Sequence, residues 1–114
     1  MSWFTEYIKK DKNNLNNISL ILAGVLYSLI KQLNTKVFND YQEKVKIYKE
    51  IERKIRTFSD VHDLGLDDFN IGILTHDVFE KEIDFETLKQ IIYNNLKFLY
   101  LIQSGQDYDK NDLI

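Results

Sequence analysis

Apolar residues recur every three or four positions along most of this chain, which is the spacing of one face of an α-helix. The clearest example lies in residues 35–58, where the repeat alternates between three and four through Phe38, Tyr41, Val45, Tyr48, Ile51, Ile55 and Phe58. The pattern predicts a helix from about Thr35 to Phe58 that buries this stripe.

Two helices are expected before it. The segment 2–12 places Trp3, Phe4, Tyr7 and Ile8 at helical spacing, with Ser2 as the N-cap. A polar junction follows, formed by asparagines 13, 14, 16 and 17. Residues 15–33 then predict a second helix with a wide apolar face, made of Ile18, Leu20, Ile21, Leu22, Val25, Leu26, Tyr27, Leu29 and Leu33. A helix that is apolar around much of its circumference is normally buried against several neighbours.

The pattern is weaker in residues 59–82, because Gly65 and Gly72 interrupt it and the apolar positions 69, 71 and 73 alternate as in a strand. We expect one or two short helices here, with Asp67 or Asp68 capping the first and Thr75 opening the next.

The last helix is better defined. Asp84 is its expected N-cap, Gly105 stands where a C-terminal glycine belongs, and the apolar stripe comprises Phe85, Leu88, Ile92, Leu96 and Leu99. The sequence therefore predicts an all-α protein, a compact bundle of four to five helices. We expect a single domain over residues 1–105 and a frayed tail over residues 106–114.

Charge is distributed unevenly along the 114 residues. Residues 1–58 contain eleven Lys and Arg against six Asp and Glu, whereas residues 59–114 contain four against twelve, so the two parts have net charges of +5 and −8. This asymmetry favours complementarity within one molecule. Head-to-tail association and a basic face for an acidic partner are the alternatives.

The amino-acid composition excludes several kinds of chemical site. The absence of cysteine excludes disulfides, thiolate metal sites and thiol catalysis, and it fits a reducing compartment. The N-terminus does not resemble a secretory signal, and the strongly apolar run from Ile18 to Ile30 is shorter than a membrane-spanning helix needs. We expect a cytoplasmic protein with no transmembrane segment and no cofactor.

Two His-Asp pairs, His62 with Asp63 and His76 with Asp77, are the candidate metal ligands. They predict, as one alternative, a small metal-dependent hydrolase. Phosphohydrolases named for a His-Asp pair need another histidine, however, and this chain has two. The Glu-x-x-His spacing of di-iron bundles is absent, as are the glycine-rich and serine-elbow motifs of nucleotide binding and serine hydrolysis. An enzyme is therefore disfavoured.

Four cations at helical spacing in residues 35–58 suggest a second alternative, a nucleic-acid-associated regulator that contacts phosphates through Lys46, Lys49, Arg53 and Arg56. Glutamates at 43, 50 and 52 in the same segment and a pI near 5.3 favour an ordinary solvated face instead.

Surplus apolar and aromatic surface favours protein binding. Tyr93 and Tyr100 lie on the polar side of the last helix, and Trp3 and Phe4 stand at the N-terminus. We predict a non-enzymatic helical module that binds a protein partner, as an inhibitor, immunity factor, adaptor or regulator. Gly24 and Ser28 lie one turn apart and would also suit a homodimer. The richness in Asn, Lys and Ile is typical of AT-rich genomes, including those of bacteria, phages and plasmids.

Overall fold

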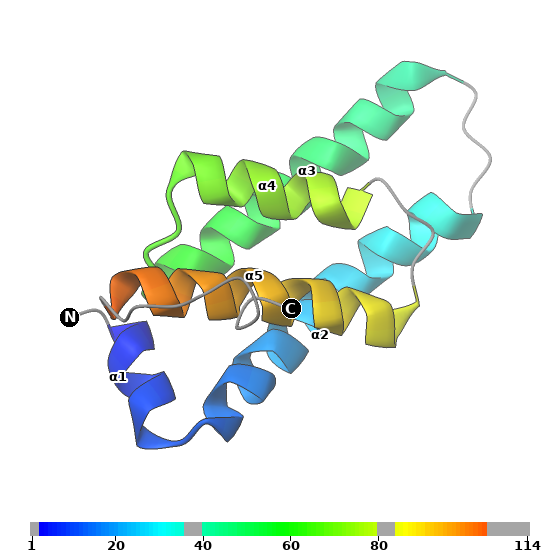
Figure 1. Cartoon of the computed structure of the whole chain (residues 1–114). Helices are drawn as coiled ribbons and strands as arrows, with labels where there is room; N and C mark the ends of the chain where they lie inside the picture. Colours follow the sequence, from blue (N-terminus) through cyan, green and yellow to red (C-terminus); the bar gives the residue numbers. More distant parts are fainter. Residues whose placement is uncertain (1–2, 36–39, 80–83, 105–114) are drawn as a thin grey trace.

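Helices form wherever the three-and-four spacing is sustained. The computed structural model describes residues 3–35, 40–79 and 84–104, and in this part of the chain it contains five helices and no strand (Figure 1). They are α1 (Trp3–Lys10), α2 (Asn13–Thr35), α3 (Tyr41–Val61), α4 (Asp68–Phe79) and α5 (Phe85–Gln103). The predicted all-α bundle of four to five helices is confirmed.

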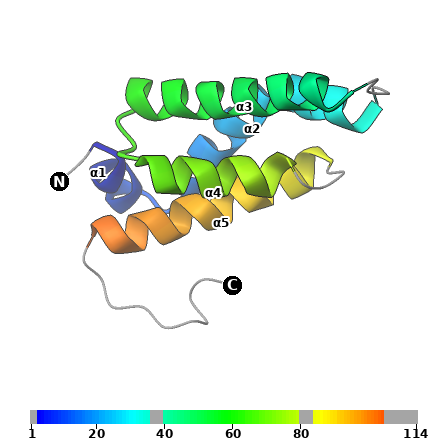
Figure 2. The same cartoon turned by 90° about the horizontal axis from the view of Figure 1, so that it is seen from above.

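Helix α2 is the centre of the bundle. It packs against α5 most extensively and also contacts α1, α3 and α4. Helix α4 lies between α3 and α5, as the view in Figure 2 shows. Among the described helices, none is long and apolar enough to cross a membrane.

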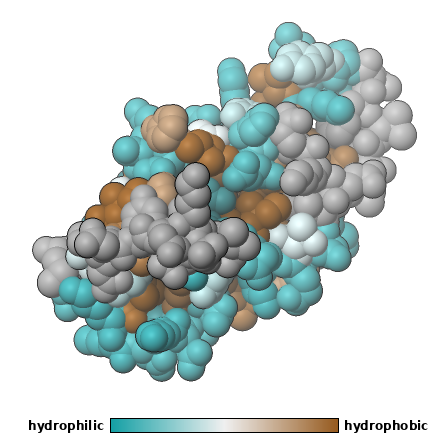
Figure 3. Space-filling view, in the orientation of Figure 1, coloured by the Kyte–Doolittle hydropathy of each residue, from teal (hydrophilic) through white to brown (hydrophobic). Residues whose placement is uncertain are grey.

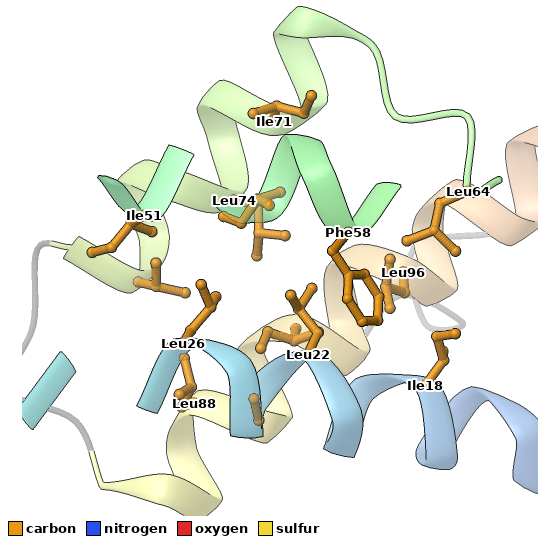
Figure 4. Packing of buried hydrophobic residues seen from close by; sticks show 14 of the residues in the cluster. Ile18, Leu22, Leu26, Ile51, Phe58, Leu64, Ile71, Leu74, Leu88 and Leu96 are labelled. Carbon is orange, nitrogen blue, oxygen red and sulfur yellow. The ribbon is translucent and has the colours of Figure 1, made fainter. Parts of the chain in front are cut away.

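One hydrophobic core receives side chains from all five helices. Fully buried residues from α2, α3, α4 and α5 point toward one another in its middle, among them Leu22, Leu26, Ile51, Leu74 and Leu88 (Figure 4). Because burial of each such side chain contributes about 1.5–3 kcal/mol, this contact holds the bundle together.

Helix α2 begins two residues earlier than predicted. Asp11 ends the connection from α1, since its carboxylate accepts from the N–H of Asn13 (2.9 Å) and its carbonyl from the N–H of Asn14 (2.9 Å). The asparagines are therefore the first turn of the helix and not a junction before it. The expected cap Ser2 lies outside the described residues.

Helix α3 begins at Tyr41 and not at Thr35, which is the last residue of α2. Its N-cap is Asp40, whose carboxylate accepts from the N–H of Glu43 (3.1 Å). The start of the predicted helix, including Phe38, lies outside the described residues.

The predicted stripe of α3 is right in its second half and wrong in its first. Ile51, Ile55 and Phe58 are buried, but Tyr41 is 75% exposed and the other two predicted members are half-buried. Ile47 is buried in their place. Both Ile47 and Tyr48 stand at helical spacing from Ile51, so periodicity alone does not choose between them.

Helix α4 is one continuous helix capped by Asp67, whose carboxylate accepts from the N–H of Asn70 (2.8 Å). Thr75 does not open a second helix. It is buried within α4, where its hydroxyl donates to the carbonyl of Ile71 (2.6 Å). The strand-like alternation at 69, 71 and 73 reflects a helix with apolar residues on two faces.

The connection from α3 to α4 is held by Gln103 at the end of α5. The backbone reverses at Asp63 and Gly65, which have φ values of 51° and 73°. The Gln103 amide donates to the carbonyl of Leu64 (2.8 Å), and its oxygen accepts from the hydroxyl of Thr5 (3.1 Å). One side chain therefore joins α5, this loop and α1.

Helix α5 follows the prediction closely. Asp84 caps it by accepting from the N–H of Thr87 (2.8 Å), and the buried stripe comprises Leu88, Ile92, Leu96 and Leu99. Phe85 is half-buried beside Tyr27 of α2. The expected C-terminal Gly105 and the tail over residues 106–114 lie outside the described residues.

Candidate functional site

The four aromatic residues predicted to bind a partner occupy different environments. Phe4 is fully buried, so that part of the prediction is wrong: α1 turns Phe4 and Ile8 into the core and Trp3 to the surface. Tyr93 and Tyr100 are half-buried and pack against the core. Trp3 is 44% exposed and is therefore the most accessible of the four.

A larger apolar surface lies where α2 and α3 meet. A shallow groove there is lined by apolar and polar side chains of both helices and by two cations at its edge: Val25, Thr57, Phe58, Val61, His62, Arg53 and Lys54. Val61 is 71% exposed and Val25 is 38% exposed. Ile21, one turn before Val25, is 49% exposed, although both were expected to be buried with the rest of α2.

Trp3 adjoins this surface through His62. The indole stacks on Tyr7 with ring centroids 4.7 Å apart, and the imidazole of His62 lies 6.4 Å from the indole. The backbone N–H of Trp3 also donates to the Asp63 carboxylate (3.3 Å), which fastens the start of α1 to the end of α3. We refer to Trp3, Ile21, Gly24, Val25, Thr57 and Val61 together as the α2–α3 face.

The α2–α3 face is nearly uncharged. No charged residue occurs between Asn13 and Ile30, so this part of α2 contributes no charge to the face. At the α3 side of the groove, Arg53 is paired with Glu50, and this hydrogen bond holds the pKa of the Glu50 carboxyl below its ordinary value. A Cβ at Gly24 would meet no atom of the described residues within 4 Å, so they leave this part of α2 uncovered.

The predicted basic strip on α3 is interrupted by acidic partners. Lys46 and Lys49 are exposed, whereas Arg53 is bound to Glu50. Arg56 pairs with Asp68 of α4 (2.7 Å) and lies 3.8 Å from Glu52, and the hydrogen bond that it donates to Asp68 raises the pKa of Arg56. The four cations therefore lie on a surface of mixed charge.

The structure places one His-Asp pair just after the end of α3 and the other within α4, and it gives their carboxylates other roles. His62 packs against Phe58 with ring centroids 4.3 Å apart, while Asp63 accepts from the N–H of Trp3. On α4, Asp77 accepts from the side-chain amide of Asn95 (3.3 Å). Within residues 3–35, 40–79 and 84–104, no three His, Asp or Glu side chains gather in a way that could hold a metal ion.

A second apolar surface lies on the outer side of α4. Phe69 is 73% exposed and Ile73 is 39% exposed, and with Gly72, His76, Asp68 and Asp77 they line a shallow depression. Figure 3 shows apolar side chains over α4 within a largely hydrophilic surface. We refer to Phe69, Gly72, Ile73 and His76 as the α4 stripe.

The chain matches no protein-family model, curated protein or solved structure. Its function is therefore inferred from the two apolar surfaces and their charges.

The sequence pattern did not predict that Val61 and Phe69 are exposed. They are the most exposed aliphatic side chain and the most exposed phenyl side chain of these two surfaces. Val61 was missed because the helix was expected to end at Phe58, one turn too early. For Phe69 a signal exists in the sequence, since Phe69 and Ile73 are four residues apart while Ile71, Leu74 and Val78 form a separate helical series. Two apolar series in one short helix indicate two contact surfaces.

Proposed function

We propose that this chain is a protein-binding module whose contact surface is the α2–α3 face. The observation that supports it best is the grouping of exposed apolar side chains. Nine large apolar residues are exposed among the described residues, and four of them, Trp3, Ile21, Val25 and Val61, belong to this face. Contiguous apolar surface of this kind is typical of protein interfaces.

The surface is carried by helices that the core holds in place. Leu22 and Leu26 of α2 and Phe58 of α3, which alternate with the exposed positions along their helices, are buried. A partner would therefore meet a preformed surface and would lose little conformational entropy in ordering it. Trp3 supplies the large aromatic side chain that commonly contributes most to such contacts.

The charges favour a protein over a nucleic acid. Phosphate binding relies on several available Lys or Arg side chains. At the α2–α3 face the cations are Arg53 and Lys54 at one edge, and Arg53 is already paired with Glu50. A partner with an apolar, uncharged contact surface matches this face better.

The proposal is tested by replacing Ile21 and Val61 with lysine in the tagged chain and comparing pull-downs from lysate of the source organism after nuclease treatment. Both positions are exposed, so the bundle should fold. Two desolvated lysines should reduce recovery of a stoichiometric partner by at least about tenfold.

Tyr41→Lys is the matched control, since it makes the same change at a 75% exposed site on a different part of the molecule. It should bind as the unaltered chain does. Equal recovery with the Ile21→Lys, Val61→Lys chain, or recovery that disappears with nuclease, would contradict the proposal.

A further inference from the structure

Helix α4 has two apolar faces, and the core covers one. Ile71, Leu74, Thr75 and Val78 are buried against the other helices. The α4 stripe occupies the outer side, and its members are spaced three, one and three residues apart, as in one side of a helix that packs against another.

The shape of the stripe suits a second helix. Phe69 projects into solvent, while Gly72 leaves the backbone of α4 bare between Phe69 and His76. A Cβ at Gly72 would meet no atom within 4 Å, so nothing in the described molecule fills this space. The backbone of an approaching helix could therefore come close to α4 beside the phenyl ring.

Carboxylates border the stripe. Asp68 and Asp77 line the depression: Asp68 is paired with Arg56, whereas Asp77 accepts from the uncharged side-chain amide of Asn95. Two carboxylates therefore stand beside the stripe, and one of them is paired with a guanidinium group. The edge of this apolar surface is acidic.

We propose that the α4 stripe is a second interaction site, which binds an amphipathic helix of another protein whose apolar side chains are flanked by Lys or Arg. The apolar side chains of that helix would cover Phe69 and Ile73, and its cations would lie near Asp68 and Asp77. This site shares no residue with the α2–α3 face, so it stands independently of the function proposed above.

The acidic edge argues against two other occupants. Two copies of the chain that met through their α4 stripes would bring Asp68 and Asp77 of each copy together, and like charges at an interface are unfavourable. An anionic membrane surface would be repelled by the same carboxylates.

The length of α4 sets the size of the contact. Its 12 residues span about 18 Å, or roughly three turns. A bound helix would therefore present apolar residues at positions i, i+3 or i+4, and i+7.

The test uses three synthetic helical peptides of about 18 residues, which span the full length of α4 with margin. One has a leucine stripe flanked by lysines, the second has the same stripe flanked by glutamates, and the third has the lysines without the stripe. Binding of the full chain to each is measured by fluorescence anisotropy at low and high salt.

The lysine-flanked stripe peptide should bind at least about tenfold more tightly than either of the other two, and added salt should weaken its binding. Phe69→Ser and Gly72→Leu should each weaken this binding by about tenfold or more. Tyr41→Ser is the matched control, because it removes an equally exposed aromatic ring elsewhere and should leave the affinity unchanged. Circular dichroism would confirm that all three variants are folded.

Four results would overturn the inference. Equal or tighter binding of the glutamate-flanked peptide would contradict the acidic edge, and equal affinities of Phe69→Ser and Tyr41→Ser would show that the stripe is not the site. Self-association that depends on Phe69 would make a second copy the occupant. Phe69-dependent binding to phosphatidylserine vesicles would make it a membrane. None of these results bears on the α2–α3 face, which has its own experiment.

Discussion

Two glycines show how strongly the effect of one residue depends on its place. Gly65 has a φ of 73°, and a Cβ there would lie 2.9 Å from the Gln103 side-chain nitrogen. Gly72 lies in the middle of α4 with ordinary helical geometry, and a Cβ there would meet no atom of the described residues within 4 Å. The backbone of the first position favours glycine, whereas that of the second accepts other residues.

Alanine at the two positions should consequently have opposite effects. Gly72→Ala should raise the free energy of unfolding by about 0.5–1 kcal/mol, since alanine has the higher helix propensity and restricts the unfolded chain. Gly65→Ala should lower it, because the left-handed conformation is strained for alanine and the Gln103 side chain must shift. Urea unfolding followed by circular dichroism measures both, and changes of the same sign would contradict this account.

The N-cap of α5 should make stability depend on acid. Hydrogen bonds from Thr87 hold the pKa of Asp84 below its ordinary value near 3.8, so the folded state favours the carboxylate. The stabilisation is complete above that ordinary value and disappears as the pH falls through the lower folded pKa. Asparagine also caps helices but does not titrate in this range.

Asp84→Asn should therefore match the unaltered chain in thermal stability near pH 7 and lose less of it between about pH 5 and pH 2. Thermal unfolding at a series of pH values provides the comparison. Two parallel curves would show that the Asp84 carboxylate does not contribute to the acid dependence.

At the scale of the element, the two sides of α4 differ in burial, and so in their contribution to stability. Ile71 is 2% exposed and Ile73 is 39% exposed, although they are two residues apart. Ile71→Ala should lower the free energy of unfolding by about 2–5 kcal/mol. Ile73→Ala should change it by less than about 1 kcal/mol. Similar losses in urea unfolding would mean that both sides are packed.

Helices with one dominant stripe and a clear cap could be predicted from the sequence. The α5 stripe and its cap Asp84 are confirmed, because Leu88, Ile92 and Leu96 leave one consistent register and Asp84 stands immediately before it. The α3 stripe is partly wrong because Ile47 and Tyr48 are adjacent and each fits the spacing to Ile51. Only the position of α2 and α4 decides which of them is buried.

The candidate surfaces were harder to predict than the helices. Trp3 and Phe4 are neighbours in a short helix, and the sequence does not reveal that the core takes one and leaves the other outside. Ile21 and Val25 have the composition of core residues, so exposure could not be predicted for them. A surface patch depends on what does not pack against it, which is a property of the tertiary arrangement.

At the scale of the whole molecule, Gln103 connects segments that are distant in sequence. Its side chain bonds to Leu64 and to the fully buried Thr5, which lies 98 residues away. Gln103→Ala should lower the free energy of unfolding by about 1–3 kcal/mol, because these polar groups lose a partner. Hydrogen exchange should become faster in α1 and in the loop before α4. Faster exchange confined to α5 would contradict this role.

All five helices share one core, so the described molecule should unfold in a single step. The chain has one tryptophan, Trp3 in α1, whose fluorescence reports on the helix at the edge of the bundle. Urea transitions measured by this fluorescence and by circular dichroism should coincide, since Phe4 and Ile8 anchor α1 in the same core. An earlier fluorescence transition would show that α1 separates first.

The uneven charge of the sequence acquires a partial explanation from the fold. The ion pair between Arg56 and Asp68 joins the basic first half to the acidic second half within one molecule. Asp77 is bonded to the uncharged amide of Asn95 instead and lines the depression on the outer side of α4, so part of the acidic surplus stays there. The charge asymmetry therefore contributes to an ion pair within the molecule and to an acidic surface on the outer side of α4.

Glycine and alanine codons differ by a single nucleotide, so one point mutation can replace Gly72 by alanine. A library of this chain selected only for resistance to heat should soon enrich alanine at position 72, where the added methyl group meets no atom in the part of the chain that the structure describes. Selection that also requires binding of the amphipathic helix proposed for the α4 stripe should keep glycine there. The residue at position 72 would thus distinguish variants selected for thermal stability alone from variants selected for binding as well.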